Sequence, residues 1–553
     1  MSNIKLFFFL FLAIFSTLSV YAQQSKYDIS APVDLKETGV NKVLCMQNGN
    51  TMLFHLEPDK SITVIVYDSL HKKITSADNV SKLLDYDHSH QFVFKGLYEI
   101  GNAAVLFMEQ SPRTKRQLIM LKFDEYTGAT IEEKLVREQR SVAKHMDFYV
   151  MKNKNIDGYA ILISEETPQF DACIEELVFY NNKNEEIRTV TIPVDRKPFD
   201  YMEIKGAEAQ ENGNCITMCL YKIATNATTH GGGVTNSKTI YDHVVLIAYV
   251  PLNTGAVREK MIDLSTNMSP YFSNYTYNRF TATLNVLLFN YQEFLTKNGL
   301  DVLQKALQSA LFFSIDPTDM SVKHNWFKND SAIQQYKTQT DTSRSYEGVP
   351  VKMFTNENGL STIISQSFTE YDEVESKRHP NAFCSYFGKI AVTQCDDDGK
   401  EIWGTLLPLA QYYKSYNHFY FARDLSKRWQ EQNIFADFPP AVYDRQFVSL
   451  NTCSFNKNLY IIYNDNNENF NNSITRPGDT VYSFQSTNAC YYKLNKKREI
   501  TKSYLFGEPA ANEYRASFIE GADFDGQRGI YASLVQYRKE GKTTLCMAWC
   551  QLD

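Results

Sequence analysis

Basic side chains stand just before short apolar stretches at intervals along this sequence, and together they could hold an anion. Guanidinium and ammonium groups bind carboxylate, sulfate or phosphate through charge-assisted hydrogen bonds. If the apolar stretches are strands that begin on one face, the basic groups form a positive ring there. The competing explanation is the polarity that exposed strand starts usually show. Lys42 and Lys197 occupy comparable positions, and we predict ligand binding at His90, His145, Arg279, Lys352, Arg445 and Arg515.

One loop has the side chains of a divalent metal site. Asp85-Tyr86-Asp87-His88-Ser89-His90 places carboxylates and imidazoles within a short stretch, and both are metal ligands. The spacing matches no established site, so a solvated loop is the preferred interpretation. Asp396-Asp397-Asp398-Gly399 and Asp523-Phe524-Asp525-Gly526 resemble fragments of calcium loops without the downstream glutamate. We predict that these two are hairpin turns, and we predict no bound metal or cofactor.

Motifs of established enzymes are missing from the sequence. It contains neither the GxSxG motif of serine hydrolases nor the HExxH motif of metalloproteases. A glycosidase needs only two well-placed carboxylates, which cannot be picked out among 64 acidic residues. Enzymatic activity is therefore open, and a non-catalytic role is favoured.

The N-terminus predicts export from the cytosol. Residues 1–22 combine Lys5, an apolar core and a small-residue end at Ala22, which is the pattern of a cleaved signal peptide. Later stretches do not reach the length of about 18 apolar residues that a membrane span needs, so no span is predicted. The formal net charge of -7 argues against non-specific binding to nucleic acid.

Ten cysteines occur in this exported chain, so its compartment permits disulfides. Cys215 and Cys219, like Cys546 and Cys550, are four residues apart on predicted strands. Their side chains then share a face but lie about 13 Å apart along the strand, too far for a disulfide within either pair. We expect buried thiols, and cross-strand disulfides between other cysteines stay open.

Eight strand-turn-strand units organise the rest of the chain, and the third strand of each is its clearest part. Polar turns rich in Asn, Asp and Gly follow these strands and suit hairpins. The chain ends after the eighth copy, which lacks a fourth strand, whereas residues 27–35 form a strand with no hairpin partner. We predict that this strand completes the eighth unit. The predicted third strands are 62–68, 118–124, 176–182, 244–250, 310–316, 389–396, 489–494 and 545–552.

This repeated pattern resembles the β-propeller superfamily at the level of architecture. Four strands per repeat of roughly 50 to 70 residues is the blade pattern of propellers. The resemblance implies an all-β ring over residues 23–553, with eight blades or alternatively seven, closed by the N-terminal strand. The sequence has none of the tryptophan-aspartate, kelch or sialidase repeat motifs. Tandem β-sandwiches, the alternative, would need flexible linkers that are missing here.

Three insertions interrupt the period. Residues 224–238 contain three consecutive glycines and are predicted to form a flexible loop. Residues 299–308 space three leucines as one face of a helix. Residues 410–444 are rich in Tyr, Phe and charge, with a helical pattern over 424–432. A long structured insertion of this kind is expected to lie over one face of the ring, where partners bind.

A fold by itself does not define a function, so two hypotheses stand. The first is a non-catalytic binding or scaffold protein of the bacterial cell envelope that docks a protein partner, such as an outer-membrane complex. The alternative is a carbohydrate-active or glycan-binding propeller that recognises an anionic ligand at the central channel. The signal ending in Tyr-Ala-Gln-Gln and the richness in Asn, Lys, Tyr and Phe resemble envelope proteins of Bacteroidota, which implies the periplasm or the cell surface.

Overall fold

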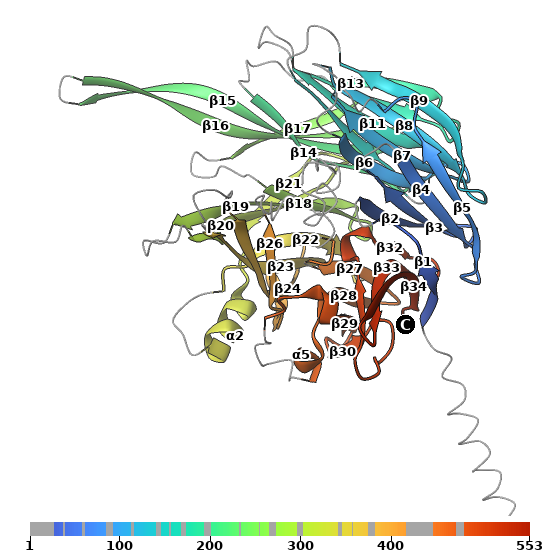
Figure 1. The fold of residues 1–553 in the computed structure, drawn as a ribbon. Helices are drawn as coiled ribbons and strands as arrows, with labels where there is room; N and C mark the ends of the chain where they lie inside the picture. Colours follow the sequence, from blue (N-terminus) through green and yellow to red (C-terminus); the bar gives the residue numbers. More distant parts are fainter. Residues whose placement is uncertain are drawn as a thin grey trace, which may run out of the picture.

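The computed structural model of this protein is an almost entirely β structure (Figure 1). The predicted signal peptide, residues 1–22, lies outside the described residues. The structure describes residues 27–36, 39–57, 61–84, 92–111, 115–139, 145–153, 156–166, 173–192, 201–231, 234–253, 255–264, 272–295, 302–340, 346–356, 358–373, 382–415, 446–448, 450–471 and 480–553.

All eight predicted third strands are confirmed. Their runs of Val, Ile, Leu and aromatic residues favour extended backbone, and most of their described apolar side chains are buried. The strands are β4 (Ser61–Tyr67), β8 (Gln117–Asp124), β12 (Cys173–Tyr180), β16 (Val234–Val250), β20 (Val302–Ile315), β24 (Ala382–Cys395), β29 (Asn488–Leu494) and β34 (Lys542–Gln551).

Four of these strands belong to separate antiparallel sheets of four strands. In each sheet the chain runs from the innermost to the outermost strand. The other strands of these sheets are β2 (Val40–Cys45), β3 (Thr51–Leu56), β5 (Lys73–Val80), β6 (Phe92–Glu99), β7 (Ala103–Gln110), β9 (Thr130–Glu138), β10 (His145–Met151), β11 (Tyr159–Glu166), β13 (Glu186–Ile192), β14 (Tyr201–Ala209), β15 (Cys215–Gly231) and β17 (Arg258–Leu264).

The remaining strands form two nine-stranded sheets, each of which contains two such four-strand series. Pairing of β20 with β23 joins the series β18–β21 to β22–β25, and a single bridge joins β29 to β31. Their other strands are β18 (Phe272–Asn278), β19 (Thr283–Leu295), β21 (Val322–Trp326), β22 (Val349–Thr355), β23 (Ser361–Glu373), β25 (Glu401–Leu407), β26 (Gln411–Ser415), β27 (Leu450–Phe455), β28 (Asn458–Asp465), β30 (Ile500–Tyr504), β31 (Glu513–Ser517), β32 (Asp523–Asp525), β33 (Ile530–Lys539) and β1 (Tyr27–Val33).

Contacts between the innermost strands arrange these series as the blades of a β-propeller. β2, β6, β10, β14, β18 and β22 contact one another in that order. The Lys352 ammonium on β22 then donates to the Thr452 carbonyl on β27 at 2.9 Å, and the short helix η2 (Ile519–Gly521) contacts both β27 and β2. This order returns to its starting strand. The predicted number of eight blades agrees with it and stays a prediction.

The predicted closing strand is confirmed. β1 pairs antiparallel with β34, from Tyr27 opposite Cys550 to Val33 opposite Leu545, so the first strand of the chain completes the sheet of the last (Figure 1). Each central strand of a blade is then hydrogen-bonded on both edges. All eight residues of β7, for example, are buried. Every residue of the outermost strand β9 is partly or fully exposed.

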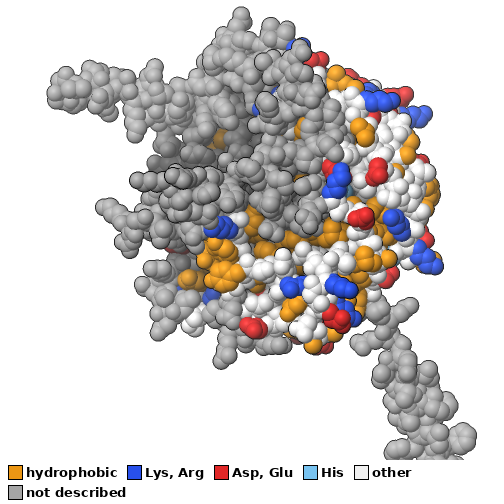
Figure 2. Space-filling model, in the orientation of Figure 1, with side chains coloured by type: hydrophobic (Ala, Val, Ile, Leu, Met, Phe, Trp, Pro, Cys, Tyr) orange, Lys and Arg blue, Asp and Glu red, His pale blue; other side chains and the backbone are white. Residues whose placement is uncertain are grey.

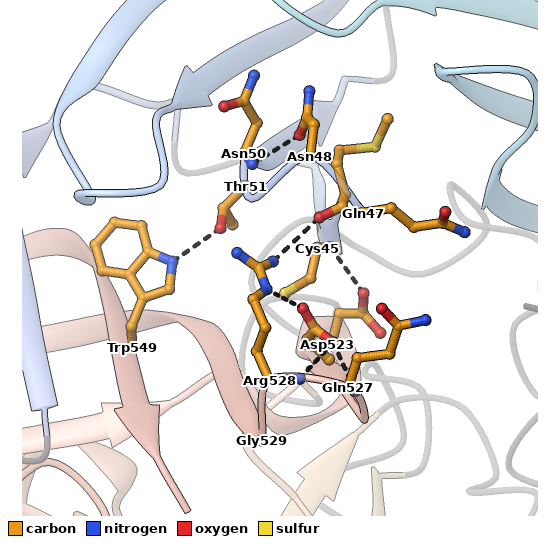
Figure 3. Close-up of polar contacts among 12 residues, drawn as sticks. Cys45, Gln47, Asn48, Asn50, Thr51, Asp523, Gln527, Arg528, Gly529 and Trp549 are labelled. Atoms are coloured by element: carbon orange, nitrogen blue, oxygen red, sulfur yellow. Dashed lines mark hydrogen bonds and ion pairs between the residues drawn. The ribbon is translucent and has the colours of Figure 1, made fainter.

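Polar contacts join the last blade to the first (Figure 3). The Trp549 indole N–H donates to the Thr51 hydroxyl at 3.0 Å, and both side chains are buried. The Arg528 guanidinium donates to the Met46 carbonyl at 3.1 Å, and an Asp523 carboxylate oxygen accepts from the Cys45 backbone N–H at 2.8 Å. We call this set of contacts the closing seam.

The insertions differ from their predictions in two places. Residues 224–231 and 234–238 belong to paired strands instead of a flexible loop, because β15 and β16 pair continuously up to Gly231 opposite Val234. The expected helix at 299–308 is a strand where it is described, since β20 begins at Val302 and pairs with β19 and β23. Strands β19 and β23 form backbone hydrogen bonds with the two edges of β20. These bonds favour the strand over the helix that the spacing of the leucines predicted. Of 410–444, only the start is described, as β26 paired with β24, and the predicted helix at 424–432 lies outside the described residues.

The thiols agree with expectation. Nine cysteines have described side chains, no disulfide joins any two of them, and only Cys453 among them is not fully buried. Burial raises the pKa of the Cys490 thiol well above its ordinary value. In the described part of the chain, no helix has the length and hydrophobicity that crossing a membrane requires.

Candidate functional site

The predicted basic residues on the innermost strands are engaged in contacts within the protein. Lys352 contacts β27 as described above. Arg515, 8% exposed, forms an ion pair with Glu513 at 2.9 Å. Lys42 is buried and donates to the Glu520 carbonyl at 2.8 Å; burial lowers the pKa of its ammonium well below the ordinary value. The contacts of Lys352 and Lys42 join different blades, whereas the Arg515–Glu513 pair lies within β31. Ligand binding at Lys352 and Arg515 stays a prediction.

Three other predicted residues fall where no side chain is described. His145 is the first residue of β10, as expected for a residue at a strand start, but its side chain is not among those described. His90 and Arg445 lie outside the described residues, as do Lys197 and the predicted metal-binding loop 85–90.

Arg279 does not precede an innermost strand, which corrects its predicted position. It follows β18 and begins the turn to β19. The Asn278 side chain accepts from the Phe280 and Thr281 backbone N–H groups, and Ala282 adopts a left-handed φ of 55°. These features end the strand at Asn278. The side chain of Arg279 therefore lies at the turn end of its strand.

The predicted turn is found at residues 396–399, whereas Asp523–Asp525 form the strand β32 and the turn there begins at Gly526. Asp396 Oδ1 accepts from the backbone N–H groups of Asp398 and Lys400, and Asp525 Oδ1 accepts from those of Gln527 and Arg528. These carboxylates are occupied by the turns themselves. Across the described residues, no three His, Cys, Asp or Glu side chains are grouped as a metal site would need.

Arg279 instead borders a pocket of about 570 Å³ between the β22–β25 and β27–β30 blades. We call it the basic pocket. The turns β18–β19, β22–β23, β27–β28 and β29–β30 all contribute to it, so it opens at the end of the blades that carries these turns. Its described lining contains no Asp or Glu, and its cationic residues are Arg279, Lys457, Lys496, Lys497 and Arg498.

Lys457 lies in the tight turn between β27 and β28. Phe455 pairs with Asn458, so the connection has two residues, and these have φ values of 48° at Asn456 and 66° at Lys457. Two consecutive left-handed residues are the geometry that hairpin connections of this length favour, usually with Asn or Gly. Lysine is therefore an unusual residue for the second position.

Arg498 is held in a left-handed conformation by the β29–β30 turn. The Asn495 side chain accepts from the backbone N–H groups of Lys497 and Glu499, and Arg498 has a φ of 66°. In the β24–β25 turn, Asp396 makes the same contacts and Gly399 stands at the equivalent position. His71 and Asn184 stand at the equivalent position of the β4–β5 and β12–β13 turns, so this turn accepts glycine and non-glycine residues.

One face of the β22–β25 blade forms the wall of the pocket. Phe354, Thr362 and Gln394 lie directly opposite one another on β22, β23 and β24, and all three line the pocket. Opposite residues of an antiparallel sheet point to the same face. The next residue in this row is Trp403, and the Arg498 guanidinium lies over its ring at 5.7 Å.

Phe280 is the exposed aromatic side chain at the rim of the pocket, with 52% of its surface accessible. The Arg279 guanidinium lies 5.1 Å from the centre of its ring. Arg279 also approaches Glu211 at 3.8 Å, with both side chains largely exposed. An exposed pair at this distance contributes little and exchanges readily, so the guanidinium can turn toward a ligand.

The charge of the basic pocket contrasts with the rest of the molecule. The chain as a whole has a net charge of -7, and Figure 2 shows basic and acidic side chains interspersed on one face. The described pocket lining holds five cations and no carboxylate, which creates a local positive potential that attracts anions. The sequence indicated only Arg279 of this set, whereas the run Lys496-Lys497-Arg498 is visible in the sequence as a basic hairpin turn.

Comparisons with known proteins bear on the architecture only. The sequence matches no family model and no curated protein. Among solved structures, the WD40 domain of SCAP from fission yeast aligns with a TM-score of 0.30 and 8% identity, over 96% of this chain and 99% of that one. An apocarotenoid oxygenase from Synechocystis aligns with a TM-score of 0.35 and 8% identity, over 95% of each chain. An α-L-arabinanase from Penicillium chrysogenum aligns with a TM-score of 0.28 and 12% identity, over 53% of this chain and 98% of that one. These slight likenesses say nothing about function.

Proposed function

We propose that this protein is a non-catalytic binding protein of the bacterial cell envelope, exported by its N-terminal signal, and that it holds an anionic ligand in the basic pocket. The observation that supports the proposal is the lining of this pocket, which gathers five cations from three turns and contains no described carboxylate. An anionic ligand is retained from the second hypothesis drawn from the sequence. Its site moves from the central channel to the end of the blades.

The turns that carry the cations support the same proposal. Two of the five cations, Lys457 and Arg498, occupy left-handed positions that glycine or asparagine would fill with less strain. Equivalent left-handed positions of other turns hold His71 and Asn184, so the support lies in the positive charge that Lys457 and Arg498 place beside the pocket. The two hairpins would form without these cations, so their presence is better explained by a ligand than by the fold.

The proposal is tested by titrating the protein with a sulfated trisaccharide and with its unsulfated counterpart at two salt concentrations. We expect binding of the sulfated probe alone, weaker at high salt because ions screen exposed charges. The variant Lys496→Gln/Lys497→Gln should bind about tenfold more weakly, which corresponds to two exposed cations at about 0.7 kcal/mol each. Calorimetry or fluorescence measures both affinities.

The matched control is Lys73→Gln/Lys183→Gln. Lys183 occupies the same place in the β12–β13 turn that Lys497 occupies in the β29–β30 turn, because Asn181 accepts from the backbone of residues 183 and 185. The control removes the same total charge from two other blades, with Lys183 in the equivalent turn and Lys73 at the start of β5. If it weakens binding as much as the pocket variant, attraction by net charge explains the result and the proposed site is wrong.

A second candidate function, docking of an envelope protein, is favoured by the β15–β16 hairpin. β14 pairs with β15 only as far as Lys222, and β17 pairs with β16 only from His243. Residues 223–231 and 234–242 continue as a two-stranded arm (Figure 1). No described strand pairs with the outer edges of this arm, and open edges accept strands of a partner.

Crosslinking in the native envelope separates the two candidates. The variant that replaces residues 223–242 by an Asn-Gly turn should lose a protein partner held by the arm and keep its affinity for the sulfated probe. Recovery of the same partner without the arm would count against docking at this hairpin.

A further inference from the structure

We propose that the ligand of the basic pocket is an acidic sugar, with a ring packed on Phe280 and a hydroxyl group bonded to Thr362. This inference rests on the proposed function and specifies its ligand. It depends on two side chains of the pocket that carry no charge and that a simple anion would not need.

Phe280 supplies the apolar surface. Its ring is half exposed at the pocket rim, and Gly359 stands beside it, where an added Cβ would lie 3.4 Å from Phe280 Cβ. Removing the exposed phenyl ring from water against another apolar surface is favourable. The C–H face of a sugar ring is such a surface, while its edge is polar. The adjacent Arg279 guanidinium, 5.1 Å from the ring centre, can then pair with a carboxylate or sulfate on that sugar.

Thr362 supplies a buried hydroxyl group with no partner among the described residues. Its side chain is 1% exposed, and its Oγ1 makes no hydrogen bond to a described group. Thr362 lies in the middle of the row formed with Phe354 and Gln394, on the face that lines the pocket. A buried polar group without a partner is costly, and a hydroxyl group that reaches the pocket wall would remove this cost.

The remaining neutral residues of the pocket suit hydroxyl groups. Asn358, Gln394 and Ser454 line it beside the cations, and amide and hydroxyl side chains both donate and accept hydrogen bonds. Sugar hydroxyl groups also do both. A sulfate ion only accepts hydrogen bonds, so it would use the cations and leave the acceptor groups of the lining unmatched, and a phosphate ion has no apolar face to cover Phe280. An acidic peptide would satisfy the cations but offers no ring for Phe280.

Two substitutions test the inference, each with a matched control. Thr362→Val keeps the side-chain shape and removes the hydroxyl group; Thr452→Val does the same at another buried threonine whose Oγ1 lacks a described partner. Neither should destabilise the fold, because each removes an unpaired buried hydroxyl group. Phe280→Ala removes the rim aromatic, and Tyr126→Ala removes an equally exposed one from the β8–β9 turn.

We expect Thr362→Val and Phe280→Ala each to weaken binding of a galacturonate trisaccharide about fivefold, and both controls to leave it unchanged. Inorganic sulfate, as a competing probe, should bind more weakly than the trisaccharide and should be insensitive to all four substitutions. Calorimetric titration measures these affinities.

Two outcomes overturn the inference in distinguishable ways. If a glutamate hexapeptide binds as tightly as the trisaccharide and Phe280→Ala and Thr362→Val change neither affinity, the pocket binds anions without recognising a sugar, and the proposed function survives. If neither the trisaccharide, the peptide nor sulfate binds, the proposed function fails together with the inference.

Discussion

Basic side chains have two different environments in this molecule. Lys42, Lys352 and Arg515 lie on innermost strands and donate to neighbouring backbone or carboxylate groups. Lys496 and Lys497 lie exposed in a turn beside a pocket. A buried cation needs a partner because leaving it unpaired costs several kcal/mol, so the fold requires the contacts of the buried Lys42 and Arg515, and the half-buried Lys352 joins two blades. The second group has no such requirement and is free to serve a ligand.

A residue-scale prediction concerns Glu513. Burial alone would raise the pKa of its carboxyl group, but hydrogen bonds from Tyr537 and Ala510 and the paired Arg515 outweigh burial and lower this pKa to about 2. The ordinary value is 4.5, so the carboxylate stabilises the fold above pH 4.5. This contribution is lost as the pH falls from 4.5 toward 2.

We therefore expect Glu513→Gln to lower the free energy of unfolding at pH 7 and to flatten its pH dependence between pH 4.5 and 2. Urea unfolding at several pH values measures both effects. Glu540→Gln, in the turn between β33 and β34, is the control for the loss of a nearby negative charge. A wild-type pH dependence that persists in Glu513→Gln would show that another carboxylate carries it.

At the scale of elements, two turns of the same backbone geometry carry opposite charges. The β24–β25 turn reads Asp-Asp-Asp-Gly-Lys at residues 396–400, and the β29–β30 turn reads Asn-Lys-Lys-Arg-Glu at residues 495–499. In both, the first side chain accepts from the backbone N–H groups two and four residues later. The turn therefore forms with either acidic or basic side chains. The hairpin does not require the cations of the second turn.

The strain at Arg498 gives an element-scale prediction. Replacing it by glycine removes a left-handed non-glycine residue, which costs about 1 to 2 kcal/mol, against a loss of about 0.5 to 1 kcal/mol from the flexibility of glycine. We expect Arg498→Gly to stabilise the protein by about 0.5 kcal/mol and to weaken binding of the sulfated trisaccharide. Thermal unfolding and titration test the two effects.

Asn184→Gly changes the equivalent position of the β12–β13 turn and serves as the control. Asparagine tolerates this conformation well, so glycine relieves no strain here; the variant should keep its affinity and lose stability, because Asn184 is buried and its side-chain amide donates to Glu132 at 3.3 Å. An Arg498→Gly variant that is both less stable and fully able to bind would contradict the role assigned to this turn.

Sequence patterns were sufficient for the strands and insufficient for the site. The third strands were predictable because each is a local apolar run bounded by turn residues, and the closing strand 27–35 was predictable because the eighth unit lacks a fourth strand. The glycines at 231–233 suggested a loop, but pairing of long flanking strands extends the hairpin to Gly231. The basic pocket combines turns from residues 276 to 498, and sequence spacing does not reveal which turns of different blades become neighbours.

At the scale of the whole molecule, the closing seam holds the ring together without a disulfide between described cysteines. Trp549 is 1% exposed, and its ring lies 5.1 Å from that of Tyr67 and 4.3 Å from that of His71. The last blade thereby packs against the first through one large side chain. Its only polar atom is satisfied by Thr51.

Removing this acceptor tests the closure. Thr51→Val leaves the Trp549 indole N–H buried without a partner, which should cost about 1 to 3 kcal/mol. Thr63→Val removes a more exposed hydroxyl group, which donates to Asp78 in the same blade, and should cost less than about 0.5 kcal/mol. Urea unfolding compares the two variants. Equal effects would mean that the seam is not a special determinant of stability.

The central claim is that an anionic ligand binds in the basic pocket, and hydrogen exchange followed by mass spectrometry tests it most directly. The backbone amides are compared with and without saturating galacturonate trisaccharide. The account predicts slower exchange in the turns at 278–282, 456–458 and 495–499, and unchanged exchange in the equivalent turn at 181–185. Protection confined to the β15–β16 arm or to the innermost strands, or no protection anywhere, would contradict it.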